Sequence, residues 1–116
     1  MKNNFYITTP IYYVNDIPHL GHAYTSFVAD TISRYKRLSN FDVYFTTGTD
    51  EHGQKVENSA RDKNINTLEF TDKVSARFKD LCSKLKLTNN DFIRTTENRH
   101  KNKVKKIWNK LIDNNE

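Results

Sequence analysis

The sequence predicts an α/β fold in which a parallel β-sheet is flanked by helices, and three observations support this. Short segments rich in aromatic and β-branched residues alternate with longer segments whose apolar residues recur every three or four positions. Strands that are separated by helices connect through βαβ crossovers, which make their pairing parallel. Polar clusters with histidine and glycine follow the first two strand-like segments, at the edge where such sheets bind ligands.

Three short segments have the composition of strands. Residues 5–9, Phe-Tyr-Ile-Thr-Thr, are uncharged and aromatic or β-branched, which predicts a strand buried on both faces. Pro10 ends this segment because proline has no N–H to donate to a neighbouring strand. Residues 42–47 form the second predicted strand, which Gly48 ends, and residues 91–96 form the third.

Four segments have helical periodicity. Residues 22–38 carry an apolar stripe, and cationic side chains lie in their last turn, where they complement the helix dipole. Further helices are predicted at residues 54–63, 67–87 and 98–113. The first stripe consists of Tyr24, Phe27, Val28, Ile32, Tyr35 and Leu38. The stripes of the last two helices consist of Val74, Phe78, Leu81 and Leu85, and of Val104, Ile107, Trp108 and Leu111.

Length and composition limit the class of protein. The 116 residues correspond to about one domain, without an internal repeat or a linker rich in Pro, Gly or Ser. No window approaches the roughly 18 apolar residues of a membrane-spanning helix, and the first residues lack the apolar run of a secretory signal. Cys82 is the only cysteine, which excludes a disulfide framework and a thiolate zinc cluster. We therefore expect a cytoplasmic protein without a membrane partner, of undetermined oligomeric state.

The formal net charge of +5 is consistent with an anionic partner such as a phosphate or a nucleic acid. Asparagine is abundant together with lysine, so part of this charge reflects composition rather than function. The basic residues between positions 94 and 110 spread around the apolar stripe of the last predicted helix, which is typical of a solvated face. Contact with RNA is the alternative interpretation of this segment.

The segment His-Leu-Gly-His, residues 19–22, stands where the loop after the first strand leads into a helix. His19 and His22 are three positions apart and so share one face of a helix. A helix N-terminus binds polyphosphate through its free N–H groups and its dipole, and imidazoles can add to this site. Gly21 lets a planar ring or a phosphate approach the backbone. Capping or surface histidines are the alternative.

The segment Thr-Gly-Thr-Asp-Glu-His-Gly, residues 47–53, follows the second strand and therefore reaches the same edge of the sheet. Asp50 in this segment can hold an ammonium group of a ligand through a charge-assisted hydrogen bond. Alternatively, the acidic pair caps the helix that follows Gly53. Tyr12 and Tyr13 either line a small-molecule pocket or cover an edge of the core.

A zinc site is a further interpretation, in which His19 and His22 act with Asp50 or His52. Zinc hydrolases with helical ligands usually place two histidines four positions apart around a glutamate. Here the interval is three and contains Leu and Gly, so the spacing argues against metal ligation.

Four segments together resemble the N-terminal catalytic segment of methionyl-tRNA synthetases, and they extend over nearly the whole chain. His-Leu-Gly-His is similar to the His-Ile-Gly-His nucleotide-binding signature of class I aminoacyl-tRNA synthetases, and Leu20 keeps its apolar anchor. The segments that narrow the resemblance to the methionine enzymes are Thr-Thr-Pro-Ile-Tyr-Tyr-Val-Asn (8–15) and Thr-Thr-Gly-Thr-Asp-Glu-His-Gly (46–53), and Asp-Phe-Ile-Arg-Thr-Thr-Glu (91–97) is also similar.

The resemblance implies that residues 1–116 form the N-terminal half of a Rossmann-type catalytic domain. The family activates methionine with ATP and then charges the cognate tRNA, and Mg²⁺ accompanies the ATP. By this resemblance, His19 and His22 are catalytic and bind ATP phosphate oxygens, stabilising the transition state in which the carboxylate of methionine attacks the α-phosphorus. Gly21 completes the implied ATP site because adenine can pack on its backbone.

The resemblance also implies a methionine site. Asp50 matches the family position that binds the amino group of methionine, and Ile11 and Tyr13 match positions that line the methionine side of the pocket. No metal ligand and no bound cofactor are expected in this segment.

A second family signature, similar to Lys-Met-Ser-Lys-Ser, is absent from the sequence, as are the inserted domain and the anticodon-binding region. We therefore interpret the chain as a fragment that is inactive alone, because half of the phosphate clamp is missing. Two alternatives stay open from the sequence. One is a non-catalytic nucleotide-binding module, and the other is a metal-dependent hydrolase that uses His19, His22 and Asp50.

Overall fold

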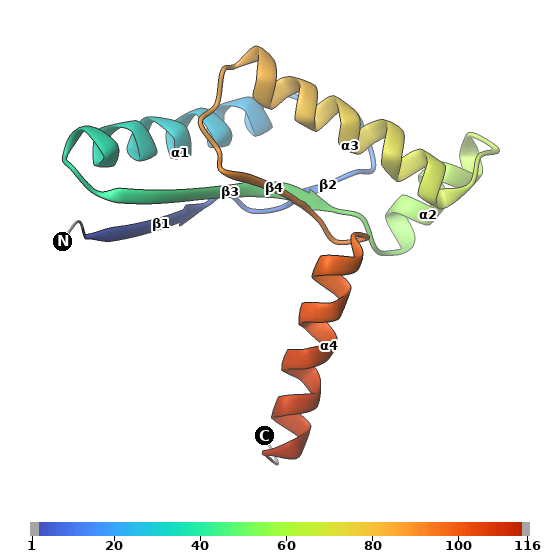
Figure 1. Ribbon diagram of the computed structural model, residues 1–116. Coiled ribbons are helices and arrows are strands. Elements are labelled where there is room, and N and C mark those ends of the chain that lie inside the picture. Colours follow the sequence, from blue (N-terminus) through green and yellow to red (C-terminus); the bar gives the residue numbers. More distant parts are fainter. Residues whose placement is uncertain (1–2, 115–116) are drawn as a thin grey trace.

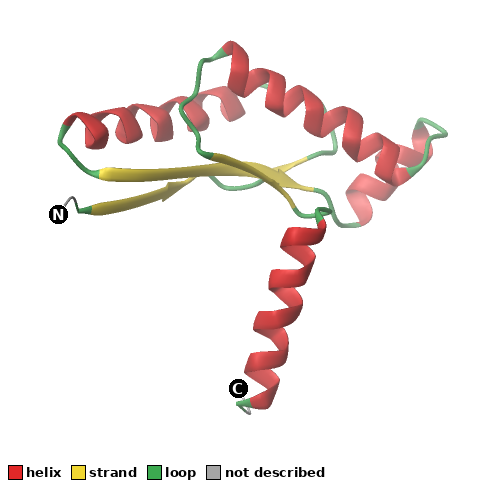
Figure 2. Ribbon diagram, viewed as in Figure 1, coloured by secondary structure: helices red, strands yellow, loops and turns green. Residues whose placement is uncertain are grey.

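The computed structural model describes residues 3–114 and confirms an α/β fold with a parallel sheet flanked by helices (Figure 1). Both long internal helices lie on the same side of the sheet, and the last helix projects away from the opposite side (Figure 2). The elements within this range are β1 (Asn4–Thr8), β2 (Tyr12–Tyr13), α1 (Leu20–Leu38), β3 (Asp42–Asp50), α2 (Gln54–Asp62), α3 (Thr67–Lys84), β4 (Asp91–Arg94) and α4 (Asn98–Asp113).

β3 is the central strand, and its backbone groups alternate between two edges. Backbone oxygens of Thr46 and Asp50 accept hydrogen bonds from Thr9 and Val14, which places β1 and β2 along one edge. The oxygen of Thr49 instead accepts from Thr95, so β4 lies along the other edge. All three pairings are parallel, and the carboxyl ends of the strands therefore meet at one edge of the sheet.

The two faces of the sheet differ in cover. Val43 and Phe45 of β3 point toward the helices and are buried, whereas Tyr44 between them is half-exposed on the other face. There its ring lies 6.0 Å from the ring of Tyr6, which is 65% exposed. The prediction that the first strand is buried on both faces was therefore wrong. β1 is an edge strand, and among the described residues no helix covers its second face.

α1 packs with a different face than its apolar stripe suggested. The predicted stripe is exposed, from 39% at Ile32 to 88% at Leu38. The face against the sheet is made of small and polar residues, which let a helix approach a sheet closely. Their polar atoms are satisfied: Ser33 donates to the backbone of its own helix, and Asp30 accepts from Arg34. The buried residues of α1 are Ser26, Ala29, Asp30 and Ser33.

Asp30 also fastens the crossover from α3 to β4. Its carboxylate accepts hydrogen bonds of 2.6 Å from the backbone N–H and the hydroxyl of Thr88. These hydrogen bonds lower the pKa of Asp30, although burial of the carboxylate acts in the opposite direction and is the largest single influence. The loop before β4 is therefore held against α1 by a buried charge with three donors, Arg34 being the third.

Several element ends differ from the prediction. β3 continues through Gly48 to Asp50, so this glycine does not end the strand. α1 starts at Leu20 rather than at residue 22, since His19 serves as its N-cap. α3 ends at Lys84 instead of residue 87, because Lys86 takes a left-handed backbone conformation with φ of 51°. α2 ends one residue early, β4 two residues early, and the short strand β2 was not predicted.

The apolar core lies between the sheet and α2 and α3. The predicted stripe of α3 is confirmed in part, because Val74 and Phe78 are buried while Leu81 and Leu85 are half-buried. The cluster consists of Tyr12, Val14, Val56, Ala60, Phe70, Val74 and Phe78, with Ile65 and Phe92 packed against it.

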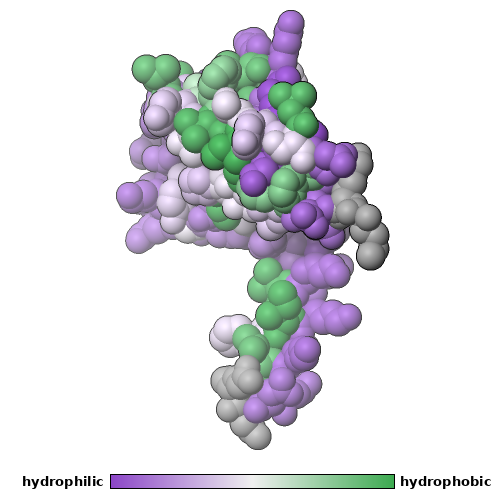
Figure 3. Space-filling model, turned by 90° about the vertical axis from the view of Figure 1, so that its left-hand side faces the viewer, coloured by the Kyte–Doolittle hydropathy of each residue, from purple (hydrophilic) through white to green (hydrophobic). Residues whose placement is uncertain are grey.

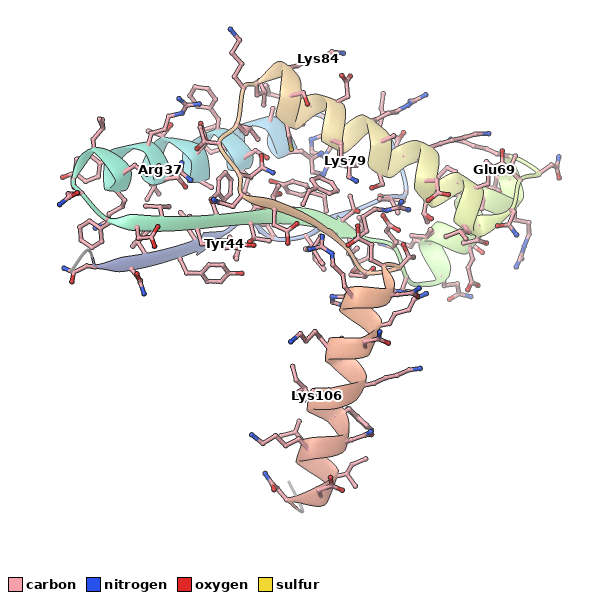
Figure 4. All side chains as sticks on the ribbon, in the orientation of Figure 1. Arg37, Tyr44, Glu69, Lys79, Lys84 and Lys106 are labelled. Carbon is pink, nitrogen blue, oxygen red and sulfur yellow. The ribbon has the colours of Figure 1, made fainter. Side chains whose placement is uncertain are left out.

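α4 has the predicted bounds but buries none of its residues. Arg99 attaches its first turn to β4 through hydrogen bonds of 2.6 and 2.9 Å to the carboxylate of Asp91. Beyond this turn the side chains radiate into solvent, Lys106 among them (Figure 4). Apolar surface runs along one side of the helix and charged surface along the other (Figure 3). Within the described range, none of the helices has the length and apolar character needed to cross a bilayer.

Replacing Gly48 by alanine should strongly destabilise the fold. The added Cβ would lie 2.1 Å from the backbone oxygen of Ile93, so β3 and β4 would have to separate. We expect a loss of about 3 kcal/mol or more in the free energy of unfolding, measured by urea denaturation. Thr46→Ala on the same strand face is the control and should change stability by less than about 1 kcal/mol. Its hydroxyl is buried without a hydrogen-bond partner. Similar losses for both variants would contradict this explanation.

Candidate functional site

A hollow of about 740 Å³ opens at the edge where the strands end, between the β1–α1 connection and the first turns of α1. Its size is in the range of small-molecule sites. The structure brings the two predicted histidines, the glycine between them and two predicted methionine-side residues to this one hollow. The lining residues are Pro10, Ile11, Tyr12, Tyr13, Asn15, Asp16, Ile17, His19, Gly21, His22 and Thr25.

The two histidines form a capping box at the N-terminus of α1. His19 is the N-cap residue, and its Nδ1 accepts a hydrogen bond of 3.0 Å from the backbone N–H of Gly21. The backbone N–H of His19 in turn donates to Nδ1 of His22 at 3.1 Å. Because both Nδ1 atoms are acceptors, the proton of each neutral ring resides on Nε2. The helix end therefore presents two imidazole N–H donors whose tautomer is set by the backbone.

Gly21 makes room for the ring of His19. A Cβ at this position would lie 2.9 Å from Cε1 and 3.1 Å from Nδ1 of that ring. The imidazole of His19 is therefore one planar group that lies against Gly21. The rings of His19 and His22 lie side by side, with centroids 3.8 Å apart.

His22 is partly buried between aromatic rings. The rings of Tyr12 and Phe78 meet it edge to face, at centroid distances of 4.9 and 5.1 Å. Burial lowers the pKa of His22, and the neighbouring His19 lowers it further. The neutral form, which the capping box requires, is therefore favoured at neutral pH.

Asp50 is the last residue of β3 and the register partner of Tyr13 in β2. Strand alternation turns its side chain to the face opposite that of Thr49, away from the helices. Asp50 does not itself line the mapped hollow, although its partner Tyr13 does. Asp50 and Tyr13, both predicted to contact methionine, are thus neighbours on adjacent strands.

Glu51 has a structural role that the sequence did not reveal. Its side chain is buried and accepts two hydrogen bonds from Arg94, at 2.7 and 2.9 Å. Thr49 and Thr96 also donate to this carboxylate. The alternative in which the acidic pair caps the next helix was wrong, because Gly53 is the N-cap of α2 and no side chain caps it.

Burial pushes the pKa of Glu51 upward, but the hydrogen bonds from Arg94, Thr96 and Thr49 outweigh it and hold the pKa below its usual value. The prediction that Arg94 belongs to a solvated basic face was therefore wrong, because its side chain is only 18% exposed. The positions of the two residues could have predicted this ion pair, because Arg94 ends β4, the strand next to β3, and Glu51 directly follows β3.

The zinc interpretation lacks its ligand set. Within residues 3–114, no group of three His, Cys, Asp or Glu side chains is placed to hold a metal ion. His52 instead lies with Nε2 3.2 Å from the backbone oxygen of Thr95. The Nδ1 atoms of His19 and His22 are already engaged by backbone N–H groups. The metal-dependent hydrolase is therefore not supported.

A family model and two similar proteins point to the same family. The family model of class I tRNA synthetases (M) matches residues 5–116. A methionine–tRNA ligase of Rickettsia conorii is 60% identical over 114 residues, which are 98% of this chain and 22% of that protein. One from Listeria monocytogenes is 50% identical over 112 residues, 97% of this chain and 17% of that protein.

A solved structure has the same fold. The methionyl-tRNA synthetase of Mycobacterium tuberculosis, in complex with methionyl-adenylate, matches with a TM-score of 0.93 and 40% sequence identity. The match covers 97% of this chain and 22% of that one. The chain thus spans about a fifth of the length of the relatives that it matches.

Substitution of His19 tests its role as the N-cap of α1. His19→Ala removes the N-cap and should destabilise the fold by about 1 kcal/mol, whereas His19→Asn keeps a capping side chain and should change stability by a few tenths at most. Urea denaturation at pH 7 measures both variants. Equal destabilisation by alanine and asparagine would show that the capping box does not stabilise α1.

Glu51→Gln should cost about 3 kcal/mol at pH 7, because it removes the buried charge partner of Arg94 and leaves that side chain with the exposed carboxylate of Asp72. The pKa of Glu51 is lowered in the fold, so its contribution is present above the unfolded value near 4.5 and is lost as pH falls through the folded pKa. The stability curves of the two proteins should therefore converge in acid. Glu57→Gln, at an exposed site on α2, is the control. A gap that persists unchanged at the lowest pH would contradict the linkage.

Proposed function

The chain belongs to the class I tRNA synthetases of the methionine type, and we propose that it forms the nucleotide-binding half of a methionine–tRNA ligase active site. In the proposed reaction a carboxylate oxygen of methionine attacks the α-phosphorus of ATP. The bond from this phosphorus to the bridging oxygen breaks, and pyrophosphate leaves with methionyl-adenylate as product. Methionine is then transferred to its cognate tRNA.

The observation that carries the proposal is the pair of imidazoles on the capped end of α1. Their Nδ1 atoms are held by backbone N–H groups, which leaves an N–H donor on each Nε2 atom. Such donors can meet phosphate oxygens at a helix N-terminus whose dipole already favours negative charge. We assign His19 and His22 to stabilise the charge that develops on the α-phosphate, since preorganised donors act most strongly there. The backbone at Gly21 would lie beside the adenine.

Methionine would bind next to these histidines. Ile11 and Tyr13 line the same hollow as the imidazoles, and Tyr13 is the register partner of Asp50. We propose that the carboxylate of Asp50 accepts hydrogen bonds from the ammonium group of methionine, while the other two residues border its side chain.

The Mg²⁺ that accompanies ATP would be bound chiefly by phosphate oxygens. The described residues offer no cluster of three carboxylate, imidazole or thiolate groups as a protein cage. Mg²⁺ commonly binds nucleotide sites in this way, with few protein ligands and several waters. A cytoplasmic location and contact with tRNA stay predictions.

Activity can be tested by grafting residues 5–116 in place of the matching segment of the Rickettsia conorii ligase. The graft should catalyse methionine-dependent exchange of pyrophosphate into ATP. His19→Asn and His22→Ala should each lower the exchange rate about 10²–10³-fold, because each removes one Nε2–H donor. His100→Asn on α4 is the control and should retain activity. A graft that folds, binds tRNA and shows no exchange would overturn the proposed function.

The proposed role of Asp50 predicts a selective effect on methionine binding, which the same graft can test. Asp50→Asn should raise the KM for methionine at least tenfold while changing the KM for ATP by less than about twofold. An equal rise in both constants would contradict the assignment of Asp50 to the ammonium group.

A further inference from the structure

We infer that Phe78 and Tyr12 are positioning residues that fix the His22 imidazole in the orientation needed for phosphate binding. The catalytic part of this inference rests on the proposed function, whereas the orientation of the ring does not. Neither aromatic residue was a candidate for this role from the sequence, because Phe78 belongs to the core stripe of α3 and Tyr12 covers the core edge.

The three rings form a wedge. Tyr12 and Phe78 stack on each other with centroids 5.5 Å apart and an interplanar angle of 20°. His22 stands nearly perpendicular to both, at 75° to Tyr12 and 86° to Phe78. Edge-to-face contact with two stacked rings disfavours rotation of the imidazole about its own side-chain bond. Rotation would also break the hydrogen bond from the backbone of His19 to Nδ1.

The wedge is itself anchored. Phe78 is 1% exposed and comes from α3, and it follows His22 by more than fifty positions in the sequence. Tyr12 comes from β2, and its hydroxyl lies 2.9 Å from the hydroxyl of Ser26 and donates to the backbone oxygen of His22 at 3.5 Å. Three elements therefore meet at one ring, and α3 contributes to the geometry of the nucleotide site without lining it.

The electrostatic surroundings agree with this geometry. Burial is the main reason that the pKa of His22 is lowered, and the neighbouring His19 on the same helix end is the second. Of the described groups in ring contact with His22, His19 and the phenol of Tyr12 are titratable, whereas the Phe78 side chain from α3 carries no charge. Removing a ring of the wedge should let water reach the imidazole.

The test compares two leucine substitutions on the same helix. Phe78→Leu removes a ring of the wedge, while Phe70→Leu removes an equally buried ring of the same core cluster that has no ring contact with His22. The chain has four histidines, so the Cε1–H signal of His22 can be assigned by substitution and followed by NMR against pH. Phe78→Leu should raise the pKa of His22 toward 6.5, and Phe70→Leu should leave it unchanged.

A common shift of the His22 titration in both leucine variants, or no shift in either, would overturn the inference. If Phe78→Leu loses its amide dispersion and is unfolded, Tyr12→Leu removes the other ring of the wedge and carries the same expectation. These readouts need no catalysis, so they decide the positioning role even if the proposed ligase activity fails.

The catalytic consequence is measured in the Rickettsia conorii graft. Phe78→Leu should lower kcat of pyrophosphate exchange on the order of tenfold to a hundredfold, because a misplaced donor weakens the transition state, while the KM for methionine stays within about twofold. The acidic limb of the rate profile should move to higher pH together with the NMR titration. Phe70→Leu should keep both kcat and the profile. A fall in kcat of equal size in the two variants would assign Phe78 a structural role only.

Discussion

The two-residue alternation along β3 is the constraint on which the rest of the structure depends. It sends Thr47 and Thr49 toward the helices and Gly48 and Asp50 toward the opposite face. A shift of one residue would place Asp50 in the core and expose the residues that now meet α3. The ion pair between Glu51, which follows β3, and Arg94, which ends β4, stabilises this register, because the buried carboxylate of Glu51 would lose its charge partner in any other one.

At the N-terminus of α1, helix stability and the proposed phosphate binding use opposite sides of the same two side chains. The Nδ1 atoms of His19 and His22 close the helix start, and this engagement directs the donors on Nε2 outward. A serine or aspartate would cap the helix as well but would present no second donor. Gly21 belongs to the same arrangement, because any larger residue would displace the ring of His19. The motif is thus a folding signal as well as the proposed binding site.

The exposed apolar surfaces show that apolar periodicity predicts a helix but not which face of the helix is buried. On α1 the periodic apolar residues face solvent, and the helix packs through small polar residues instead. The spacing of Ser26, Ala29, Asp30 and Ser33 is also helical, so both stripes were visible in the sequence. Which of the two faces packs depends on the distance between the helix and the sheet, and small residues allow a shorter distance. On α4 the stripe was predicted correctly but meets no other element within residues 3–114.

The sequence by itself determined the alternation of strands and helices, the parallel sheet, and the position of His19 and His22 at the sheet edge where the strands end, because these follow from local periodicity and from strand direction. Ile11 and Tyr13 were assigned to the same site by the family resemblance, and they line the same hollow as the histidines. Only the tertiary structure decided which partners surround these residues. Glu51 meets Arg94 and His22 meets Phe78 across more than forty residues of sequence. Such pairs depend on the packing of separate elements, and local patterns carry no information about that distance.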